Sequence, residues 1–355
     1  MGVGIILKRC FMKKIFVVSL LLLGGGLLQA QKGATSSRET TSSRETTASR
    51  ETTASRETTS SRRATSSRGA TSSRGKTSIR DLTSNRGPSS RRPVISGHRG
   101  GAAVGYPENC IPTFTHTLGA APAMFEIDPH LTKDSGIVLL HDETLDRITT
   151  GHGRLNELTL AEARKLFLKD ARGAVTSYHL NTLEEAIKWA KGRAILNLDI
   201  KDVPPVMKAD LVRRYNAFDY VMFTVHTPQE ARFFYDYDHR SRCSAWIMDE
   251  KEMKAYEQAG VPWSAIAIAY VGALSKVENK SFYDMLHQRG VLVMVSGAPV
   301  YDKEEGAEQR AADYRKIIQD GADVIESDRP IEAAAAVGVA ATSAGVAAGA
   351  ESSKH

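Results

Sequence analysis

Cysteine is scarce in this chain, with three occurrences among 355 residues. Cys10 lies close to the start, so only Cys110 and Cys243 remain for the main body of the sequence. Two cysteines cannot build the disulfide framework of a small secreted domain. A single bridge between them is compatible with the sequence, but the pattern favours two unpaired thiols. Neither Cys243 nor Ser96 stands in a nucleophile elbow.

The sequence also lacks an apolar run long enough to cross a membrane near its start. The apolar stretch within "MKKIFVVSLLLLGGGLLQAQ", residues 12–31, is shorter than the roughly 20 residues that a spanning helix needs. Two lysines, an apolar core and Ala30 before Gln31 form the pattern of a secretory signal. We therefore expect residues 1–30 to be a signal peptide and the mature protein, without a transmembrane span, to be periplasmic or secreted. No cysteine follows the core at lipoprotein spacing.

Apolar and aromatic residues are nearly absent from the next segment, residues 31–92. It repeats six-residue units such as "TSSRET" and "TSSRGA". So few apolar side chains cannot offset the entropy cost of ordering, and a period of six matches neither a helix nor a strand. The segment is therefore expected to be a disordered tether.

Charge is distributed unevenly along the chain. Residues 1–92 contain 18 lysines and arginines against 5 acidic residues, whereas the whole chain has a formal net charge of +6, so residues 93–355 are net negative. The excess of basic residues therefore lies in the tether, and it gives no information about the ligand of the folded domain. Weak contact of the tether with an anionic surface remains open. Nucleic acid binding is not expected, because the repeats lack aromatic residues for stacking on bases.

Strand-forming and helix-forming segments alternate over residues 93–336. Eight runs suit strands, and most are separated by amphipathic segments, several of which end at glycine. The eight runs are "RPVISGH", "AMFEIDPH", "AILNLDIK", "DYVMFTVH", "CSAWIMD", "SAIAIAYV", "VLVMVSG" and "ADVIESD". This alternation predicts an α/β protein with a (β/α)8 TIM barrel. A doubly wound sheet fits less well, because no glycine-rich dinucleotide fingerprint follows the first run. Residues 337–355, rich in Ala and Gly, are expected to be a low-complexity tail.

Acidic residues recur at the ends of two of these runs. Glu126 and Asp128 are two apart in "FEIDPH", as are Asp199 and Lys201 in "LDIK". This spacing places both members of a pair on one face of a strand. Converging carboxylates repel one another without a cation, and oxygen donors suit one hard divalent metal ion, Ca²⁺ or Mg²⁺. Solvated acids at the barrel edge are the structural alternative.

Two histidines also follow apolar runs. His98 and Arg99 end the first run, and His141 ends "GIVLLH". Catalytic groups of TIM barrels lie at the carboxyl ends of the strands. Beside a metal, one histidine can act as general base and the other as general acid, while Arg99 and Lys201 neutralise a phosphoryl group.

Seven segments carry these residues in order along the chain. They are "HRGG" (98–101), "PENC" (107–110), "FEIDPHLTKDSG" (125–136), "HDETLDRITTGHG" (141–153), "NTLEEA" (181–186), "DIK" (199–201) and "GADVIESDRP" (321–330). In order and spacing they resemble the motifs of the glycerophosphodiester phosphodiesterase family. The resemblance covers nearly all of residues 93–336.

The resemblance implies metal-dependent hydrolysis of a phosphodiester in a phospholipase-C-like TIM barrel. It assigns an acid–base pair, two phosphate-binding residues and three metal ligands: His98 and His141; Arg99 and Lys201; Glu126, Asp128 and Asp199. Asp199 stands where the family has Glu, which shortens one ligand by a methylene.

Glu108 and two aromatic residues have less certain roles. Glu108 is expected either to support the site from outside it or to act as an acid at a helix start. The family's Trp-Thr-Val-Asn-like stretch, whose aromatic ring packs against glycerol, is replaced by "VMVSGAPVYDKEEG". Tyr301 or Trp246 could take its place, although each is also compatible with a core or surface position.

The remaining polar candidates are interpreted as structural. His116, His130, His152 and His179 have no partner at metal-ligand spacing and are expected in loops or on the surface. The segment Glu326 to Pro330 is expected to close the barrel rather than to act in catalysis.

The expected function is hydrolysis of a small-molecule glycerophosphodiester to an alcohol and glycerol 3-phosphate. Two alternatives remain at this stage. One is a phosphodiesterase for a phosphoinositide, a sphingolipid or a cell-wall polymer. The other is a catalytically inactive barrel that serves as a surface-binding module.

Overall fold

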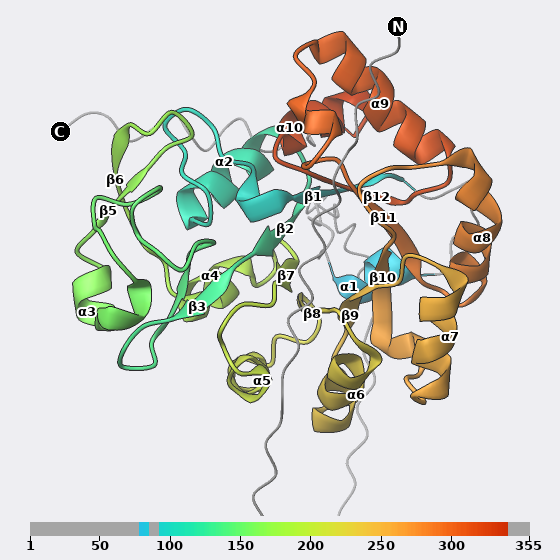
Figure 1. Cartoon of the computed structure of the whole chain (residues 1–355), viewed down its shortest axis with the longest axis horizontal. Coiled ribbons are helices and arrows are strands. Elements are labelled where there is room, and N and C mark those ends of the chain that lie inside the picture. Colours follow the sequence, from blue (N-terminus) through green and yellow to red (C-terminus); the bar gives the residue numbers. More distant parts are fainter. Residues whose placement is uncertain (1–77, 85–91, 340–355) are drawn as a thin grey trace, which may run out of the picture. The chain divides into compact units, whose positions relative to one another are not determined.

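All eight predicted strands form, and together they close a barrel. The computed structural model describes residues 78–84 and 92–339. The strands are parallel and follow the order β1-β12-β11-β10-β9-β8-β7-β2 around the barrel. Their bounds are β1 (Val94–Gly97), β2 (Met124–Ile127), β7 (Leu196–Leu198), β8 (Val221–Val225), β9 (Cys243–Trp246), β10 (Ile266–Tyr270), β11 (Leu292–Ser296) and β12 (Val324–Ser327). The predicted TIM barrel is confirmed (Figure 1).

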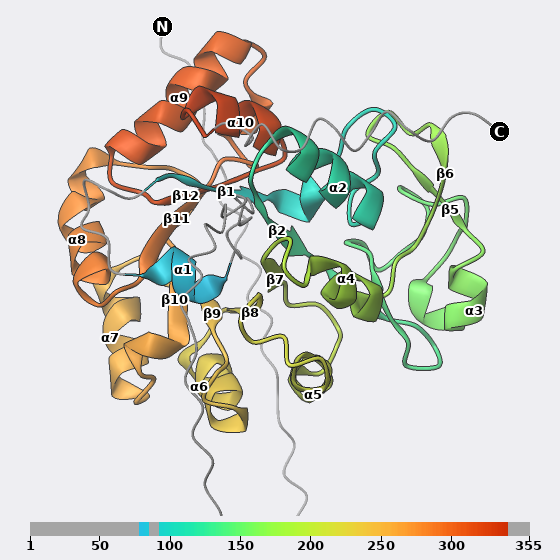
Figure 2. The same ribbon diagram turned by 180° about the vertical axis from the view of Figure 1, so that it is seen from behind.

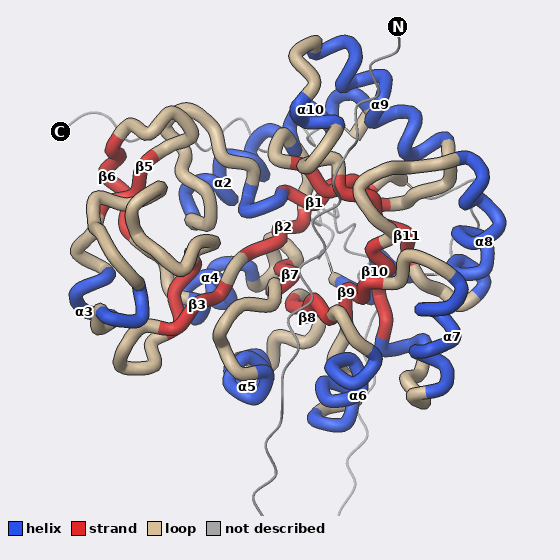
Figure 3. The backbone as a smooth tube through the Cα atoms, in the orientation of Figure 1, coloured by secondary structure: helices blue, strands red, loops and turns tan. Residues whose placement is uncertain are grey.

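Helices surround the strands as an outer ring (Figure 3). They are α2 (Ile111–Ala120), α4 (Leu183–Ala190), α5 (Pro205–Arg214), α6 (Pro228–Tyr237), α7 (Glu250–Gln258), α8 (Lys280–Gln288), α9 (Ala307–Gln319) and α10 (Pro330–Ala336). The first seven coincide with amphipathic segments that the sequence predicts between the strands, although α2 extends one residue past Gly119, its predicted end. The last, α10, was not predicted; it begins at Pro330, a residue whose fixed φ suits the first turn of a helix. Short 3₁₀ helices occur at η2 (His98–Gly100), η3 (Leu155–Glu157), η4 (Trp263–Ala265), η5 (Val277–Asn279) and η6 (Tyr301–Lys303).

The apolar strand residues and the inner faces of the helices form one large core cluster. Every residue of β8 and of β11 is buried. Such strands are apolar along their whole length because both faces of a parallel barrel are covered. Cys110 and Cys243 are buried and unpaired, which confirms the prediction of two free thiols.

A large insertion separates β2 from α4. It contains two small antiparallel sheets, β3 (Pro129–Leu131) with β4 (Ile137–Leu139) and β5 (Phe167–Lys169) with β6 (Val175–His179), and a short helix, α3 (Leu160–Ala163). The insertion has an apolar cluster of its own, separate from that of the barrel. It lies beyond β2 and α2, at the left of Figure 1, and it was not predicted as a unit.

A helix within the predicted tether corrects one expectation. Residues 31–92 were expected to be disordered, but α1 (Ile79–Thr83) forms and begins with a capping box between Ser78 and Asp81. The Ile79 side chain is only 2% exposed, and its N–H donates to the carbonyl of Asp219 at 2.8 Å. In this repeat unit isoleucine and leucine replace polar residues, and that apolar surface favours packing on the barrel. The predicted signal peptide, the rest of the tether and residues 340–355 lie outside the described residues.

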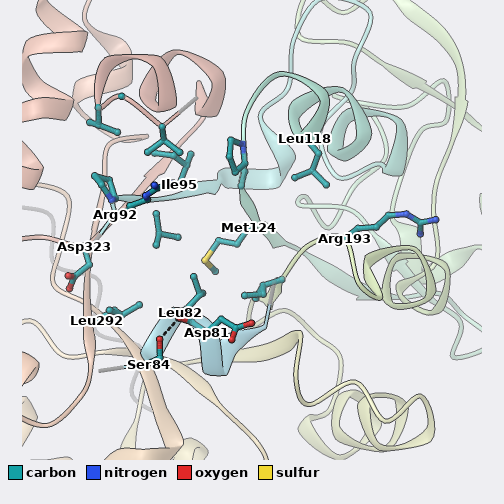
Figure 4. A pocket seen from close by; sticks show the side chains of 18 residues that line it. Asp81, Leu82, Ser84, Arg92, Ile95, Leu118, Met124, Arg193, Leu292 and Asp323 are labelled. Atoms are coloured by element: carbon teal, nitrogen blue, oxygen red, sulfur yellow. Dashed lines mark hydrogen bonds between the residues drawn. The ribbon is translucent and has the colours of Figure 1, made fainter. Parts of the chain in front are cut away.

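Helix α1 lies at the amino-terminal end of the barrel strands. Figure 2 shows this end, because it turns the view of Figure 1 by 180°. A cavity of about 680 Å³ opens there (Figure 4), lined mainly by apolar side chains such as Leu82, Met124 and Leu292. Because barrel enzymes react at the opposite, carboxyl end, this cavity is not expected to be catalytic. In the described part of the chain, no helix has the length and hydropathy needed to span a bilayer.

Replacing Ile79 by alanine is expected to lower the free energy of unfolding by about 2–5 kcal/mol, because it removes a buried side chain and leaves a cavity. Arg80→Ala, on the exposed side of the same helix, should change it by less than about 0.5 kcal/mol. Chemical denaturation of the full-length chain measures both. Equal midpoints for the two variants would contradict the packing of α1.

Candidate active site

Three carboxylates meet at the carboxyl end of the barrel. Glu126 belongs to β2, Asp128 follows it, and Asp199 follows the neighbouring strand β7. One oxygen of each lies within 4.8 Å of the others. The predicted convergence is confirmed, and the shorter side chain of Asp199 still reaches the cluster.

The electrostatics of this cluster favour a bound cation. Burial and the charges of neighbouring carboxylates, first Asp128, raise the pKa of Glu126 well above its usual value. Burial also acts to raise the pKa of Asp128, but the ammonium of Lys201 and a hydrogen bond from Asn109 outweigh it and leave the pKa lowered. Nζ of Lys201 lies 3.1 Å from Asp128 and 2.9 Å from Asp199. Three oxygen donors of this kind fit a hard divalent ion.

The carboxylate of Asp328 holds the imidazole ring of His98 in place. Nδ1 of His98 donates to Oδ1 of Asp328 at 2.7 Å, and Nε2 lies 3.9 Å from Oε2 of Glu126. Asp328 also accepts from Nζ of Lys303 at 2.9 Å, and its backbone N–H donates to Oδ2 of Asp302 at 2.6 Å. The segment Glu326 to Pro330, expected to serve barrel closure, therefore supplies the residue that orients His98.

The pKa values of this pair reflect their contact. Burial lowers the pKa of His98, but the hydrogen bond to Asp328 and the charge of Glu326 outweigh it and leave the pKa raised. Burial acts to raise the pKa of Asp328, but the hydrogen bond from His98 outweighs it and lowers this pKa to about 2.

His141, from the insertion, has a matching arrangement. Its Nδ1 donates to Oδ1 of Asp142 at 2.8 Å, and Asp142 accepts from Nε of Arg147 at 2.7 Å. Arg147 also donates two hydrogen bonds to Glu108, at 2.6 and 2.9 Å, and Glu108 lies 3.5 Å from Arg99. In both histidines Nδ1 is bound to a carboxylate, which leaves Nε2 for a substrate.

Glu108 therefore links two arginines rather than starting a helix. Helix α2 begins later, at Ile111, with Cys110 as its N-cap. Through Arg147, the Glu108 carboxylate connects the loop after β1 to the insertion that carries His141. This geometry favours the supporting role over the helix-start alternative.

The conformation of the loop after β1 requires glycine at positions 100 and 101. Arg99 adopts a left-handed conformation (φ 53°), and its N–H donates to Oε2 of Glu126 at 3.0 Å. Gly100 and Gly101 also have positive φ, and a Cβ at either would lie within 2.5 Å of the Phe114 ring or of Pro330. Glycine is needed here because the backbone turns tightly against α2 and α10.

A small cavity of about 160 Å³ lies among these residues. Its lining is His98, Glu126, Asn197, Asp199, Thr224, Ser244, Trp246, Tyr270, Met294, Ser296 and Glu326. Trp246 lies in the cavity wall, and its ring centroid is 5.2 Å from that of Tyr270 and 3.9 Å from that of His226. Tyr301 does not line it, and its hydroxyl accepts from the N–H of Ser275.

Four other histidines were expected in loops or on the surface. That expectation is wrong for His130, which is buried and lies 3.0 Å from Asp202 and 3.2 Å from the carbonyl of His141. His152 and His179 are exposed, and His116 is half-buried against Tyr106. Because its partners lie 11 and 72 positions away, no local pattern marks His130 as buried.

Two solved structures of glycerophosphodiester phosphodiesterases are similar to this chain. A glycerophosphoryl diester phosphodiesterase from Parabacteroides distasonis ATCC 8503 is 46% identical, with 76% of this chain and 95% of that chain covered at a TM-score of 0.71. A glycerophosphodiester phosphodiesterase from Agrobacterium tumefaciens str. C58 shares the fold, at 21% identity and a TM-score of 0.56, over 68% of this chain and 99% of that one.

The curated relatives match over shorter stretches. YhdW of Bacillus subtilis strain 168 is 38% identical over 112 residues, which cover 31% of this chain and 45% of YhdW. The glycerophosphodiester phosphodiesterase of Caldanaerobacter subterraneus subsp. tengcongensis is 40% identical over 73 residues, 21% of this chain and 30% of that protein. The chain thus spans less than half the length of these two relatives.

The family model with the description "Glycerophosphoryl diester phosphodiesterase family" matches residues 98–330. The match runs from His98, at the end of the first barrel strand, to Pro330, just after the last, and so includes every site residue described above. The resemblance found in the sequence motifs is confirmed, and the chain belongs to the glycerophosphoryl diester phosphodiesterase family of enzymes.

Proposed function

We propose that this protein hydrolyses glycerophosphodiesters to glycerol 3-phosphate and an alcohol. One observation carries the proposal: two histidines, each with Nδ1 bound to a carboxylate, accompany three clustered carboxylates and two cationic side chains. A surface-binding barrel has no need of two such oriented histidines. Family membership supports the same reaction class.

Glu126, Asp128 and Asp199 would hold one divalent metal ion, Ca²⁺ or Mg²⁺. When bound, the ion supplies positive charge that stabilises the phosphoryl oxygens as negative charge builds on them. Arg99 and Lys201 bind the same phosphoryl group, and Lys201 exchanges part of its contact with the carboxylates for the substrate.

His98 and His141 move the protons. One accepts the proton of the attacking oxygen as the new oxygen–phosphorus bond forms. The other donates a proton to the alcohol oxygen as its bond to phosphorus breaks. The attacking oxygen belongs either to water or to a substrate hydroxyl that first gives a cyclic phosphate; both routes use the same two Nε2 atoms.

We also propose that the protein is exported to the periplasm or secreted. The support is the sequence pattern of residues 1–30, which lie outside the described residues.

Purified full-length protein is expected to release glycerol 3-phosphate from glycerophosphocholine, glycerophosphoethanolamine or glycerophosphoglycerol. Chelation should abolish release, and added Ca²⁺ or Mg²⁺ should restore it. An enzyme-coupled assay for glycerol 3-phosphate measures both. Absence of release with either metal would refute the proposal, and turnover of phosphoinositides, sphingolipids or cell-wall polymers alone would assign another phosphodiester.

Metal addition is also expected to raise the melting temperature, because it relieves repulsion among the carboxylates. Asp199→Asn should weaken that effect by about 10-fold or more in metal concentration, since it removes one charged ligand. Differential scanning calorimetry reports this without any substrate. Asp313→Asn, on α9, is the matched control, and an identical metal response of the two variants would remove Asp199 from the metal site.

His141→Ala is expected to lower kcat by about 10²- to 10⁴-fold, because it removes one member of the acid–base pair. His152→Ala, an exposed histidine in the same insertion, should leave kcat unchanged. Circular dichroism verifies that both variants fold. Full activity of folded His141→Ala would contradict its assignment.

Asp328→Asn is expected to lower the pKa of His98, because the carboxylate hydrogen bond that raises it is lost. The activity should fall by about 10- to 100-fold, as for other partners that orient a functional histidine. NMR titration of the His98 imidazole measures the shift, with the exposed Glu305→Gln as control. An unchanged His98 pKa would show that Asp328 does not control this ring.

A further inference from the structure

The interior of the barrel below the metal site is unusually polar. Barrel interiors are normally filled by layers of branched apolar side chains. Here five polar side chains line the cavity from five different strands: Asn197, Thr224, Ser244, Ser296 and Glu326. All five are buried. Their small size leaves the cavity of about 160 Å³ open instead of filling it.

Glu326 is the charged member of this layer, and the reaction described above does not use it. Its side chain is 9% exposed, and burial raises its pKa. It lies outside the group of three carboxylates whose oxygens approach within 4.8 Å. A buried carboxyl group that is neither a metal ligand nor part of an ion pair calls for hydrogen-bond donors.

The neighbours of Glu326 include the charge of the His98 imidazole and the hydroxyl groups of two serines. It is paired in register with Ser96 on β1 and with Ser296 on β11, and the Ser296 side chain hydrogen-bonds to it. The Ser96 hydroxyl is buried and has no hydrogen-bond partner among the described residues. The layer therefore has unused hydrogen-bonding capacity next to the carboxylate.

Strands β9 and β10 supply the aromatic surface of the cavity. Trp246 and Tyr270 line it, and their rings lie 5.2 Å apart between centroids. A carboxylate and hydroxyls below, with aromatic rings at the side, suit a ligand with hydroxyl groups on a short carbon chain. The cavity volume corresponds to about five water molecules at roughly 30 Å³ each, which is close to the size of a three-carbon polyol.

We propose that Glu326 determines specificity by accepting hydrogen bonds from the free hydroxyl groups of the glycerol moiety. Ser296 holds the carboxylate, and Trp246 contacts the carbon chain. The inference rests on the proposed function and deepens it: the substrate class is phosphodiesters of a free polyol, and acyl groups on these hydroxyls would remove the donors that Glu326 needs.

Two ligand pairs that differ only in hydroxyl groups test the proposal. Turnover compares glycerophosphocholine with propyl phosphocholine, and isothermal titration calorimetry compares glycerol 3-phosphate with propyl phosphate, all with the full-length protein and Mg²⁺ or Ca²⁺. Glu326→Gln should lower kcat/KM for glycerophosphocholine, and affinity for glycerol 3-phosphate, by about 10- to 100-fold, the effect of losing a hydrogen bond to a charged group. The hydroxyl-free ligands should change by less than about twofold. If a substrate hydroxyl is the attacking oxygen, propyl phosphocholine is not turned over, and the propyl phosphate titration supplies this comparison. Glu305→Gln, an exposed glutamate, is the control.

Each other outcome has a defined meaning. Equal losses for both members of a pair would overturn the proposal and place Glu326 in the chemistry or in folding. A loss with glycerophosphocholine but not with glycerophosphoglycerol would also overturn it, because it would show recognition of the cationic alcohol. If the wild-type protein hydrolyses neither diester, the proposed function fails, but discrimination between glycerol 3-phosphate and propyl phosphate still decides the role of Glu326.

Discussion

The mutual repulsion of buried carboxylates at the mouth of the barrel is the constraint around which the site is built. Glu126 and Asp128 are both buried beside Asp199. Lys201 offsets part of this charge, and the remaining negative charge is compatible with a bound divalent ion. The backbone of the first loop contributes as well, since the Arg99 N–H binds Glu126. The tight glycine turn therefore helps to offset the negative charge of the cluster, as Lys201 does.

Much of this architecture could be predicted because its signals are local. A parallel barrel strand is apolar along its length, so eight runs were visible in the sequence, and the two-residue spacing of Glu126 and Asp128 follows from strand geometry. The carboxyl ends of neighbouring strands meet at one edge, which brings Asp199 to the same place. His98 could be found for the same reason, because it ends a barrel strand, whereas His141 follows β4 of the insertion and not a barrel strand.

The features that were missed depend on contacts between distant parts of the chain. Asp328 is 230 positions from His98, and although it lies in the family motif "GADVIESDRP", no local pattern indicates its contact with His98. The inward direction of the Glu326 side chain depends on the register of β12 with β1 and β11, which no local sequence pattern shows. Helix α1 was not predicted because only two apolar residues, Ile79 and Leu82, distinguish its repeat unit from the others. These two residues stabilise the helix by packing against the barrel, which is a contact that the repeat unit alone does not show.

The two histidines belong to parts of the molecule with separate cores. His98 is at the end of a barrel strand, whereas His141 is in an insertion with its own apolar cluster. The ion pair of Arg147 with Glu108 joins the two parts across the site, whereas its ion pair with Asp142 lies within the insertion. Glu126 and Asp199, two of the three proposed metal ligands, belong to the barrel, whereas Asp128 directly precedes β3 and its carbonyl accepts from the N–H of Leu140 in the insertion. Under the proposed roles of these residues, loss of the insertion would disturb one metal ligand and also remove His141, so a complete site depends on the assembly of both parts.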